Sequence, residues 1–281
     1  EDVLHTLNAF KAMGVKIEEN NNKIIIHGNG LNSLKEPKND IYLGNSGTSA
    51  RLLTGLLSSQ NFDTILKGDE SLSKRPMRRI SDPLLKMNAN ISTTNGTLPI
   101  CIKGGQLIST NIDLKIPSAQ IKSGILLASL NTKGETIITE NKVTRDHTEI
   151  MLESFGANIK VYNEDGKKIL KILGQEELFA KNIDVPNDLS SSAFFIVAAL
   201  INKNSRIVLK NINNNPTRNG ILYALKKMGG KISFFNERSH NNENICDIEV
   251  ITSNLNGCEL GAEIADLMID EYPILAVAAS F

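Results

Sequence analysis

The sequence has no excess of charge of either sign, because 31 basic and 31 acidic residues give a formal net charge of zero. The charges are mixed along the chain, so nothing provides the positive field that a nucleic-acid-binding surface needs. Nucleic acid is therefore excluded as the expected partner. A small-molecule ligand is the starting hypothesis.

Cysteine and long apolar runs are also scarce. The three cysteines, Cys101, Cys246 and Cys258, form no CxxC pair, which suits reduced thiols in a reducing compartment rather than a disulfide framework. No apolar run reaches the about eighteen residues that a membrane span requires. The start at Glu1 lacks the basic region and cleavage site of a signal peptide. We expect a cytoplasmic protein that does not bind a membrane.

The chain is long enough for two domains, since 281 residues with 41% hydrophobic content can bury a core in each. It opens at Glu1 inside a helical pattern, without an initiator Met, and it stops inside the apolar run Ile274–Phe281. We therefore expect an internal piece of a longer protein.

A helix-like segment that ends at a glycine or an asparagine recurs along the chain. Its stop positions are separated by 74, 68 and 73 residues: Gly14, Asn88, Gly156 and Gly229. Such a residue predicts a left-handed C-cap that turns the chain into a strand. A short strand candidate follows each stop: Lys23–His27, Pro99–Ile102, Lys168–Ile172 and Asp247–Ile251.

A second kind of helix alternates with the first. Its predicted starts are Gly44–Thr48, Pro117–Gln120, Pro186–Ser190 and Asp270–Pro273. The first three are spaced by 72 residues and again by 72, counted from Ser46 to Ser118 to Ser190. These helices are apolar nearly all round, so we expect them to be buried, whereas the first kind should face solvent on one side. Each repeat is thus a strand, a buried helix, a strand, a surface helix and a hairpin.

The starts of the buried helices carry the functional inference. Each has Ser, Thr, Asn or Asp with small residues, where free backbone N–H groups and the helix dipole favour anions. Ordinary N-capping explains any one such start equally well. Because stacked repeats aim their N-termini at one surface, four starts in register predict a site for highly anionic substrates.

Five ordered motifs over essentially the whole chain resemble one enzyme family. Leu43–Arg51 (LGNSGTSAR) is similar to the LGNxGTxxR signature of the 5-enolpyruvylshikimate-3-phosphate synthases, and Ser73–Met77 (SKRPM) is similar to their RPM segment. The other matches are Ser118–Ser123, Thr144–Glu149 and Asp270–Pro273.

The resemblance implies a fold and a reaction. The fold is a mixed α/β (α+β) two-domain inverse α/β barrel of repeated βαβαββ units, of which about four of six are expected here, with domains at 1–182 and 183–281. The reaction transfers the enolpyruvyl group from phosphoenolpyruvate to the 5-hydroxyl of shikimate 3-phosphate and releases phosphate. It needs no metal and no cofactor, and a monomer is expected.

The resemblance also implies roles for individual residues. Shikimate 3-phosphate is expected to contact the SAQ element and the following loop: Ser118, Ala119, Gln120, Thr144 and Arg145. Phosphoenolpyruvate is expected at three further positions: Asn45, Gly47 and Arg75. Hydroxyl and N–H donors with a fixed guanidinium suit both anions. Since Gly47 has no Cβ, the backbone can come close to the ligand, and we predict sensitivity to glyphosate.

Asp270 matches the catalytic base of the family, which also contacts shikimate 3-phosphate. Glu271 beside it is expected to cap a helix or to support the site. Arg51 matches the arginine that ends the LGNxGTxxR motif. Asp188 and Ser190 match further motif positions with a positioning role, whereas Arg218 is interpreted as part of a structural turn before a surface helix.

Two alternatives remain open. The UDP-N-acetylglucosamine enolpyruvyl transferases share the fold and phosphoenolpyruvate, but they typically carry a Cys before the Arg-Pro pair, and Gly68–Met77 contains none. A catalytically inert repeat scaffold is the second alternative.

Overall fold

The computed structural model describes residues 1–21, 23–174 and 177–281. The chain folds into two compact units. The first unit comprises Glu1–Val143 and Phe155–Lys181, and the second comprises Thr144–Ser154 and Asn182–Phe281. The assignment of 1–182 and 183–281 to two domains of a longer protein stays a prediction.

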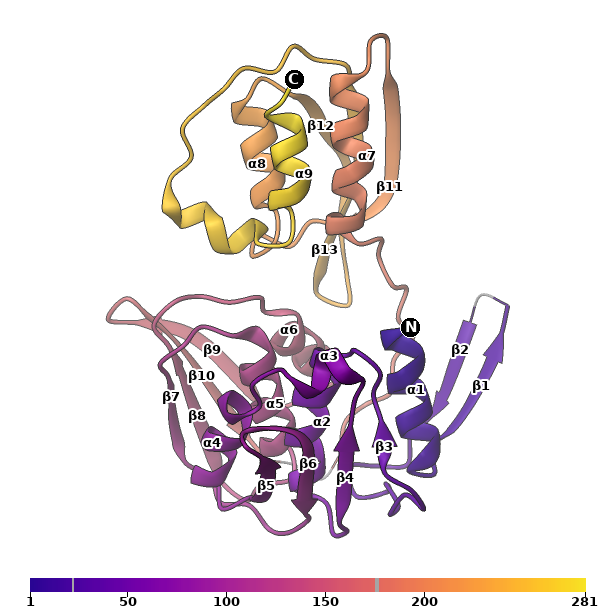
Figure 1. The fold of residues 1–281 in the computed structure, drawn as a ribbon, viewed down its shortest axis with the longest axis vertical. Helices are drawn as coiled ribbons and strands as arrows, with labels where there is room; N and C mark the ends of the chain where they lie inside the picture. The colour runs from indigo at the N-terminus through magenta and orange to yellow at the C-terminus, as the bar shows by residue number, and fades with distance from the viewer. Residues whose placement is uncertain (22, 175–176) are drawn as a thin grey trace. The chain divides into compact units, whose positions relative to one another are not determined.

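The first unit contains two four-stranded sheets with the same strand order (Figure 1). One has the order β3-β4-β6-β5 and the other β7-β8-β10-β9. In each sheet the first two strands are parallel and the other pairs are antiparallel. A separate hairpin joins β1 to β2. The bounds are β1 (Lys16–Asn20), β2 (Lys23–His27), β3 (Ile41–Tyr42), β4 (Thr64–Lys67), β5 (Asn90–Thr94), β6 (Thr97–Lys103), β7 (Asn111–Leu114), β8 (Glu135–Glu140), β9 (Ile159–Glu164) and β10 (Lys167–Leu173).

Two helices form the buried centre of the first unit. They are α2 (Gly47–Ser58) and α5 (Ala119–Ser129), and each has eight buried residues. Their backbones come very close, since a Cβ on Gly55 would lie 1.9 Å from the Gly124 carbonyl oxygen. The remaining helices of this unit are α1 (Asp2–Ala12), α3 (Glu70–Ser73) and α4 (Arg78–Lys86).

The second unit is built on one antiparallel sheet of order β11-β13-β12. Its core joins apolar residues of α7, α8 and the sheet, among them Ile196, Leu225 and Ile248. The bounds are α6 (His147–Ser154), α7 (Leu189–Ile201), β11 (Arg206–Asn213), α8 (Gly220–Lys227), β12 (Lys231–His240), β13 (Glu243–Ile251), the 3-10 helix η1 (Ala262–Met268) and α9 (Tyr272–Ala278).

The helix-to-strand corners predicted from the sequence are confirmed. Gly14, Asn88, Gly156 and Gly229 all have positive φ, between 66° and 94°, two residues after the ends of α1, α4, α6 and α8. Asparagine and glycine tolerate this left-handed conformation, which other side chains disfavour. The four strand candidates are confirmed as well, because they lie in β2, β6, β10 and β13.

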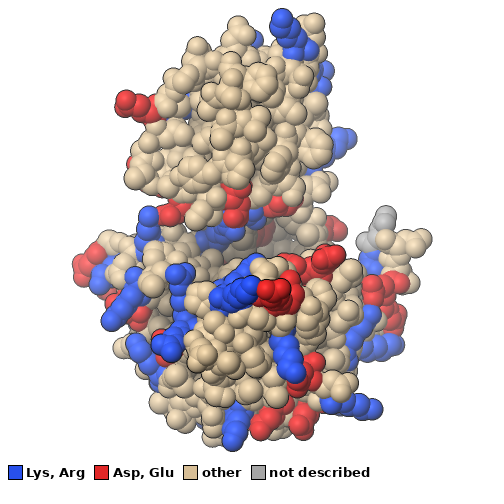
Figure 2. Space-filling view, viewed as in Figure 1, with Lys and Arg blue, Asp and Glu red and all other residues tan. Residues whose placement is uncertain are grey.

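The prediction that all helices of the second kind are buried is wrong for α7 and α9. Phe194 and Phe195 of α7 are 54% and 64% exposed, and α9 buries only Ile274 and Ala278. In Figure 1, α7, α8 and α9 lie on one side of the sheet, and Figure 2 shows few charged side chains over them. Each of α7 and α9 thus buries one set of residues and exposes another.

The mixed α/β class is confirmed. Among the described residues the sheets are open and none closes on itself, so the six-repeat inverse barrel stays a prediction. Across the part of the chain that the structure describes, no helix has both the length and the apolar character needed to cross a bilayer.

Candidate functional site

The N-terminus of α2 is shaped by the segment Gly44–Gly47. Gly44 has a φ of +55°, and Ser46 is the N-cap residue, whose Oγ accepts a hydrogen bond from the Ser49 N–H at 3.2 Å. Ordinary capping is therefore present here. The Gly47 N–H donates to the Asn45 carbonyl oxygen at 2.9 Å, and the Thr48 N–H lies at the positive end of the helix dipole.

Two arginine side chains converge on Gly47. A Cβ built on this glycine would lie 2.9 Å from an Nη1 atom of Arg51 and 2.9 Å from that of Arg75. Arg75 also donates a hydrogen bond to the Oδ1 atom of Asn45. The Nδ2 atom of Asn45 donates to Asp69 at 3.0 Å. Asn45, Gly47 and Arg75, predicted together from the motifs, are thus neighbours in the first unit.

The guanidinium of Arg51 is surrounded by like charge. Burial, followed by the positive charges of Arg75 and Arg79, lowers the pKa of Arg51. An arginine still stays protonated at neutral pH. Three cations around a helix N-terminus therefore repel one another, and a bound dianion would relieve that repulsion.

The start of α5 lies beside the same cluster. Ser118 is its N-cap residue, Ala119 is its first helical residue, and Gln120 follows. The Oε1 atom of Gln120 accepts a hydrogen bond from Arg51 at 2.7 Å, and its Nε2 atom donates to the Thr48 Oγ1 atom at 2.8 Å. The first-unit candidates Ser118–Gln120 and Arg51 are therefore brought together.

Sequence reasoning missed Thr48 as a partner of Gln120. A signal was present, because Thr48 and Gln120 are 72 residues apart, the same spacing that separates Ser46 from Ser118. Two residues with this spacing thus contact each other directly.

A buried ion pair supports the start of α5 and was also missed. The Lys122 Nζ atom lies 2.9 Å from the Glu140 Oε2 atom, with side-chain exposures of 0% and 1%. Lys122 is four residues after Ser118, and Glu140 is the last residue of β8. The pair joins the first turn of α5 to the strand that leads into the Thr144–Arg145 loop.

In the second unit, Asp188 is the N-cap residue of α7. Its Oδ2 atom accepts hydrogen bonds from the Ser191 N–H and Oγ, each at 2.8 Å. Arg218 lies 3.0 Å from the Asp188 Oδ1 atom and donates to Ser190 at 2.6 Å. Burial raises the pKa of Asp188, but the bonds from Ser191 and the charge of Arg218 outweigh it and lower that pKa. Arg218 precedes α8 as expected, yet it also fixes two candidate residues.

Arg145 and Asp270 form an ion pair within the second unit. Asp270 follows η1 and lies two residues before the start of α9, so the predicted helix start at Asp270–Pro273 is confirmed. Of the two roles expected of Glu271, the side-chain cap is wrong. Glu271 occupies the N-cap position and is buried, but its side chain makes no capping hydrogen bond. A loop carries Asp270 because Pro273 suits the first turn of the helix that follows.

The candidates are divided between the units. Those of the first unit are Asn45, Gly47, Arg51, Arg75, Ser118, Ala119 and Gln120, and those of the second are Thr144, Arg145, Asp188, Ser190 and Asp270. In the second unit, the contacts join Arg145 to Asp270 and, separately, Arg218 to Asp188 and Ser190. A single site drawn from both units stays a prediction.

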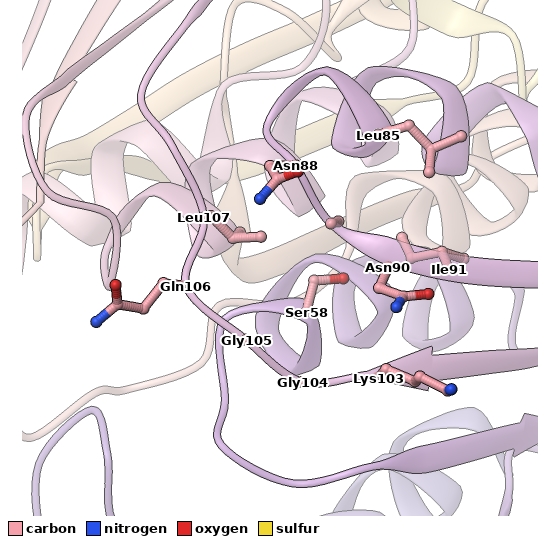
Figure 3. A pocket seen from close by; sticks show the side chains of 11 residues that line it. Ser58, Leu85, Asn88, Asn90, Ile91, Lys103, Gly104, Gly105, Gln106 and Leu107 are labelled. Atoms are coloured by element: carbon pink, nitrogen blue, oxygen red, sulfur yellow. The ribbon is translucent and has the colours of Figure 1, made fainter.

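A cavity of about 460 Å³ lies elsewhere in the first unit (Figure 3). Ser58, Asn88, Asn90 and Lys103 are among its lining residues, and none of the candidate residues lines it. Ser58 ends α2, eleven residues from Gly47, which at 1.5 Å per helical residue is roughly 16 Å away. The cavity is thus separate from the arginine cluster.

Comparisons with known proteins agree on one family. The sequence profile described as EPSP synthase (3-phosphoshikimate 1-carboxyvinyltransferase) matches residues 1–281. The 3-phosphoshikimate 1-carboxyvinyltransferases of Ruthia magnifica and Legionella pneumophila are 50% and 46% identical over the whole chain. The chain spans 64% of the length of each. A solved structure of EPSP synthase from Acinetobacter baumannii matches with a TM-score of 0.89 and 48% identity, covering 98% of this chain and 62% of that one.

Proposed function

Because the chain belongs to the EPSP synthase family, we propose that it forms part of an enzyme that transfers the enolpyruvyl group of phosphoenolpyruvate to shikimate 3-phosphate. The acceptor is the 5-hydroxyl, and phosphate is released. Since the chain spans 64% of its curated relatives, the reaction is proposed for the protein that contains it.

The observation that carries this proposal is the arginine cluster at the start of α2. The guanidinium groups of Arg51 and Arg75 both lie beside Gly47, each with a nitrogen 2.9 Å from the position of a Cβ built there. Phosphoenolpyruvate carries a phosphate and a carboxylate, and guanidinium groups bind both kinds of oxyanion in bidentate fashion. We assign Asn45, Gly47 and Arg75 to phosphoenolpyruvate, with Arg51 between this substrate and Gln120.

Shikimate 3-phosphate is assigned to the start of α5 and to the Thr144–Arg145 loop. Ser118, Ala119 and Gln120 offer a hydroxyl, a backbone N–H and an amide. Thr144 and Arg145 add a second hydroxyl and a positive charge. The hydrogen bond between Gln120 and Arg51 then links the two substrate positions.

Asp270 is the proposed base. As the 5-hydroxyl oxygen attacks C2 of phosphoenolpyruvate, its proton passes to the Asp270 carboxylate and a proton is added at C3. The resulting tetrahedral adduct loses phosphate, and a proton leaves C3 to restore the double bond. Arg145 forms an ion pair with this carboxylate, so the proposed base and a proposed shikimate 3-phosphate contact are neighbours in the second unit.

Replacement of the base tests the proposal. In the full-length protein, Asp270→Ala should lower kcat by about 100-fold or more while calorimetry shows shikimate 3-phosphate binding largely preserved. Glu259→Gln, an exposed change in the loop after β13, is the matched control and should leave kcat unchanged. If Asp270→Ala turns over like the wild type, Asp270 is not the base; if the wild type converts neither substrate, the proposed reaction is wrong.

A further inference from the structure

The segment Thr144–Ser154 leaves the first unit in sequence and packs with the second. Val143 before it and Phe155 after it both belong to the first unit. Arg145, near its beginning, pairs with Asp270. The proposed reaction gives no role to the next two residues, Asp146 and His147, yet both are bound by side chains of the second unit.

Asp146 is held by an asparagine whose orientation is fixed. The Asn215 Nδ2 atom donates to the Asp146 Oδ1 atom at 2.7 Å. The Oδ1 atom of Asn215 accepts from the N–H and the Oγ1 of Thr217, at 2.8 and 2.7 Å. Asn215 is 1% exposed. Since its oxygen is engaged by Thr217, its amide nitrogen faces an acceptor, and Asp146 supplies one.

His147 is held by a carboxylate on the sheet. Its Nδ1 atom lies 2.6 Å from the Glu243 Oε1 atom. The other oxygen of Glu243 accepts hydrogen bonds from Asn213 at 3.1 Å and Asn215 at 3.4 Å. Burial raises the pKa of Glu243, but the bond and charge of His147 and the two amides outweigh it and lower that pKa. Glu243 is therefore an ionised partner for His147 at neutral pH.

These contacts form a hydrogen-bonded site in the second unit that binds the side chains of Asp146 and His147. Asn213 ends β11 and Glu243 begins β13, two strands paired in one sheet. Buried, mutually hydrogen-bonded polar groups specify one geometry. The contacts of Asp146 and His147 restrict the backbone of this segment. The backbone of Arg145 is restricted as well, because its Cα lies only about 3.8 Å from that of Asp146.

We propose that Asp146 and His147 are positioning residues that hold Arg145 at the substrate. The inference rests on the proposed function, in which Arg145 contacts shikimate 3-phosphate beside Asp270. An arginine side chain has large rotamer freedom of its own. Anchoring the next two residues fixes the backbone from which Arg145 reaches, so that its guanidinium meets the phosphate without a further ordering cost.

The test in the full-length protein compares Asp146→Ala with Glu153→Ala, an exposed change on α6 in the same segment. Asp146→Ala should raise KM for shikimate 3-phosphate about 10- to 100-fold, as a misplaced binding group does, and should change KM for phosphoenolpyruvate and kcat less than about threefold. Glu153→Ala should change none of them. A rise in both KM values together with a general loss of stability would mark the contact as merely structural and overturn the proposal.

Two further variants sharpen the test. In an Arg145→Ala background, Asp146→Ala should cause almost no additional loss of shikimate 3-phosphate binding, because it acts through Arg145; additive losses overturn the proposal. His147→Asn, whose amide nitrogen can take the place of Nδ1, should retain more affinity than His147→Ala. Equal affinities of the two His147 variants for shikimate 3-phosphate would contradict the positioning role of His147.

A readout without substrate separates this inference from the proposed function. Hydrogen exchange of the Arg145 Nε–H, followed by nuclear magnetic resonance, should accelerate about tenfold in Asp146→Ala when an ordered contact is lost, and not in Glu153→Ala. If the Arg145 Nε–H exchanges at the same rate in Asp146→Ala, the positioning role is overturned even if the enzyme is active. Faster exchange in Asp146→Ala, in a protein that binds no shikimate 3-phosphate, supports the positioning of Arg145 and contradicts the proposed reaction.

Discussion

Gly47 controls the room between two guanidinium groups. In Gly47→Ala, the new Cβ would stand 2.9 Å from the nearest nitrogens of Arg51 and Arg75, so these flexible heads must move. We expect KM for phosphoenolpyruvate to rise about tenfold, as small displacements of binding groups cost one to two orders of magnitude, and inhibition by glyphosate to weaken. Steady-state kinetics measures both.

The matched control for this change is Gly105→Ala. A Cβ at Gly105 has no atom within 4 Å, and its kinetics should match the wild type. If Gly47→Ala leaves both KM and inhibition unaltered, the ligand does not approach Gly47.

Removing one partner of the buried Lys122–Glu140 pair should lower the free energy of unfolding more than replacing both partners with apolar residues. Lys122→Met alone leaves a buried carboxylate without this partner, and we expect the free energy of unfolding to fall by about 3–5 kcal/mol. The double change Lys122→Met with Glu140→Leu should recover part of that loss, because it removes both charges of the pair while Lys168, opposite Glu140 in the sheet, is left in place. Urea unfolding measures both.

An exposed pair provides the comparison. Lys74 and Glu70 are 73% and 87% exposed, so Lys74→Met should lower the free energy of unfolding by less than about 1 kcal/mol. A single Lys122→Met variant as stable as the wild type would show that the buried pair contributes nothing.

At the level of elements, the crossing of α2 and α5 sets how the two helix starts meet. In Gly55→Ala, a Cβ would lie 1.9 Å from the Gly124 carbonyl oxygen, and backbone cannot yield as a side chain does. We expect a loss of about 1–3 kcal/mol, typical of overpacking, and a weaker contact between Arg51 and Gln120. Thermal unfolding and phosphoenolpyruvate affinity measure the two effects.

Gly28 offers the control for this helix crossing, since nothing lies within 4 Å of a Cβ built there. Gly28→Ala should unfold like the wild type. Equal stability of Gly55→Ala and Gly28→Ala would mean that the helices can separate without cost.

The sequence predicted these elements well where the signal is local. Gly14 and Asn88 end helices because few other residues accept a positive φ, and the stops alone locate the strands that follow. Ser46, Ser118 and Asp188 cap α2, α5 and α7, as side chains of their types do. Local conformational preference thus fixed the boundaries.

The sequence predictions fail for features that depend on contacts between residues far apart in the chain. An apolar pattern cannot say which element will cover it, so the exposed Phe194 and Phe195 were expected inside. Lys122 and Arg218 look like surface cations in the sequence, and only the fold brings Glu140 and Asp188 to them.

On the scale of the whole molecule, the chain passes between its two compact units three times, after Val143, Ser154 and Lys181. A cut between Lys181 and Asn182, through an inserted protease site, removes only one passage. We expect the two pieces to elute together in native size-exclusion chromatography, because Asp146 and His147 keep the first piece bound to the second.

The same experiment with Asp146→Ala and His147→Ala should release part of the smaller piece. The cut site itself is expected to be harmless, since Lys181 is exposed and lies outside helices and strands. Complete separation of the wild-type pieces without denaturant would contradict the docking of Thr144–Ser154.

The left-handed turns have a chemical consequence. Among the described residues, eight non-glycine residues have positive φ, and seven of them are asparagine. The backbone nitrogen of the next residue can attack an asparagine amide, which releases ammonia and leaves aspartate or isoaspartate. Asn95, in the turn between β5 and β6, is followed by Gly96, which has no Cβ of its own to hinder this attack. Asparagine is among the heat-labile residues, so we expect storage and warming to modify this turn chemically even while the cores stay folded.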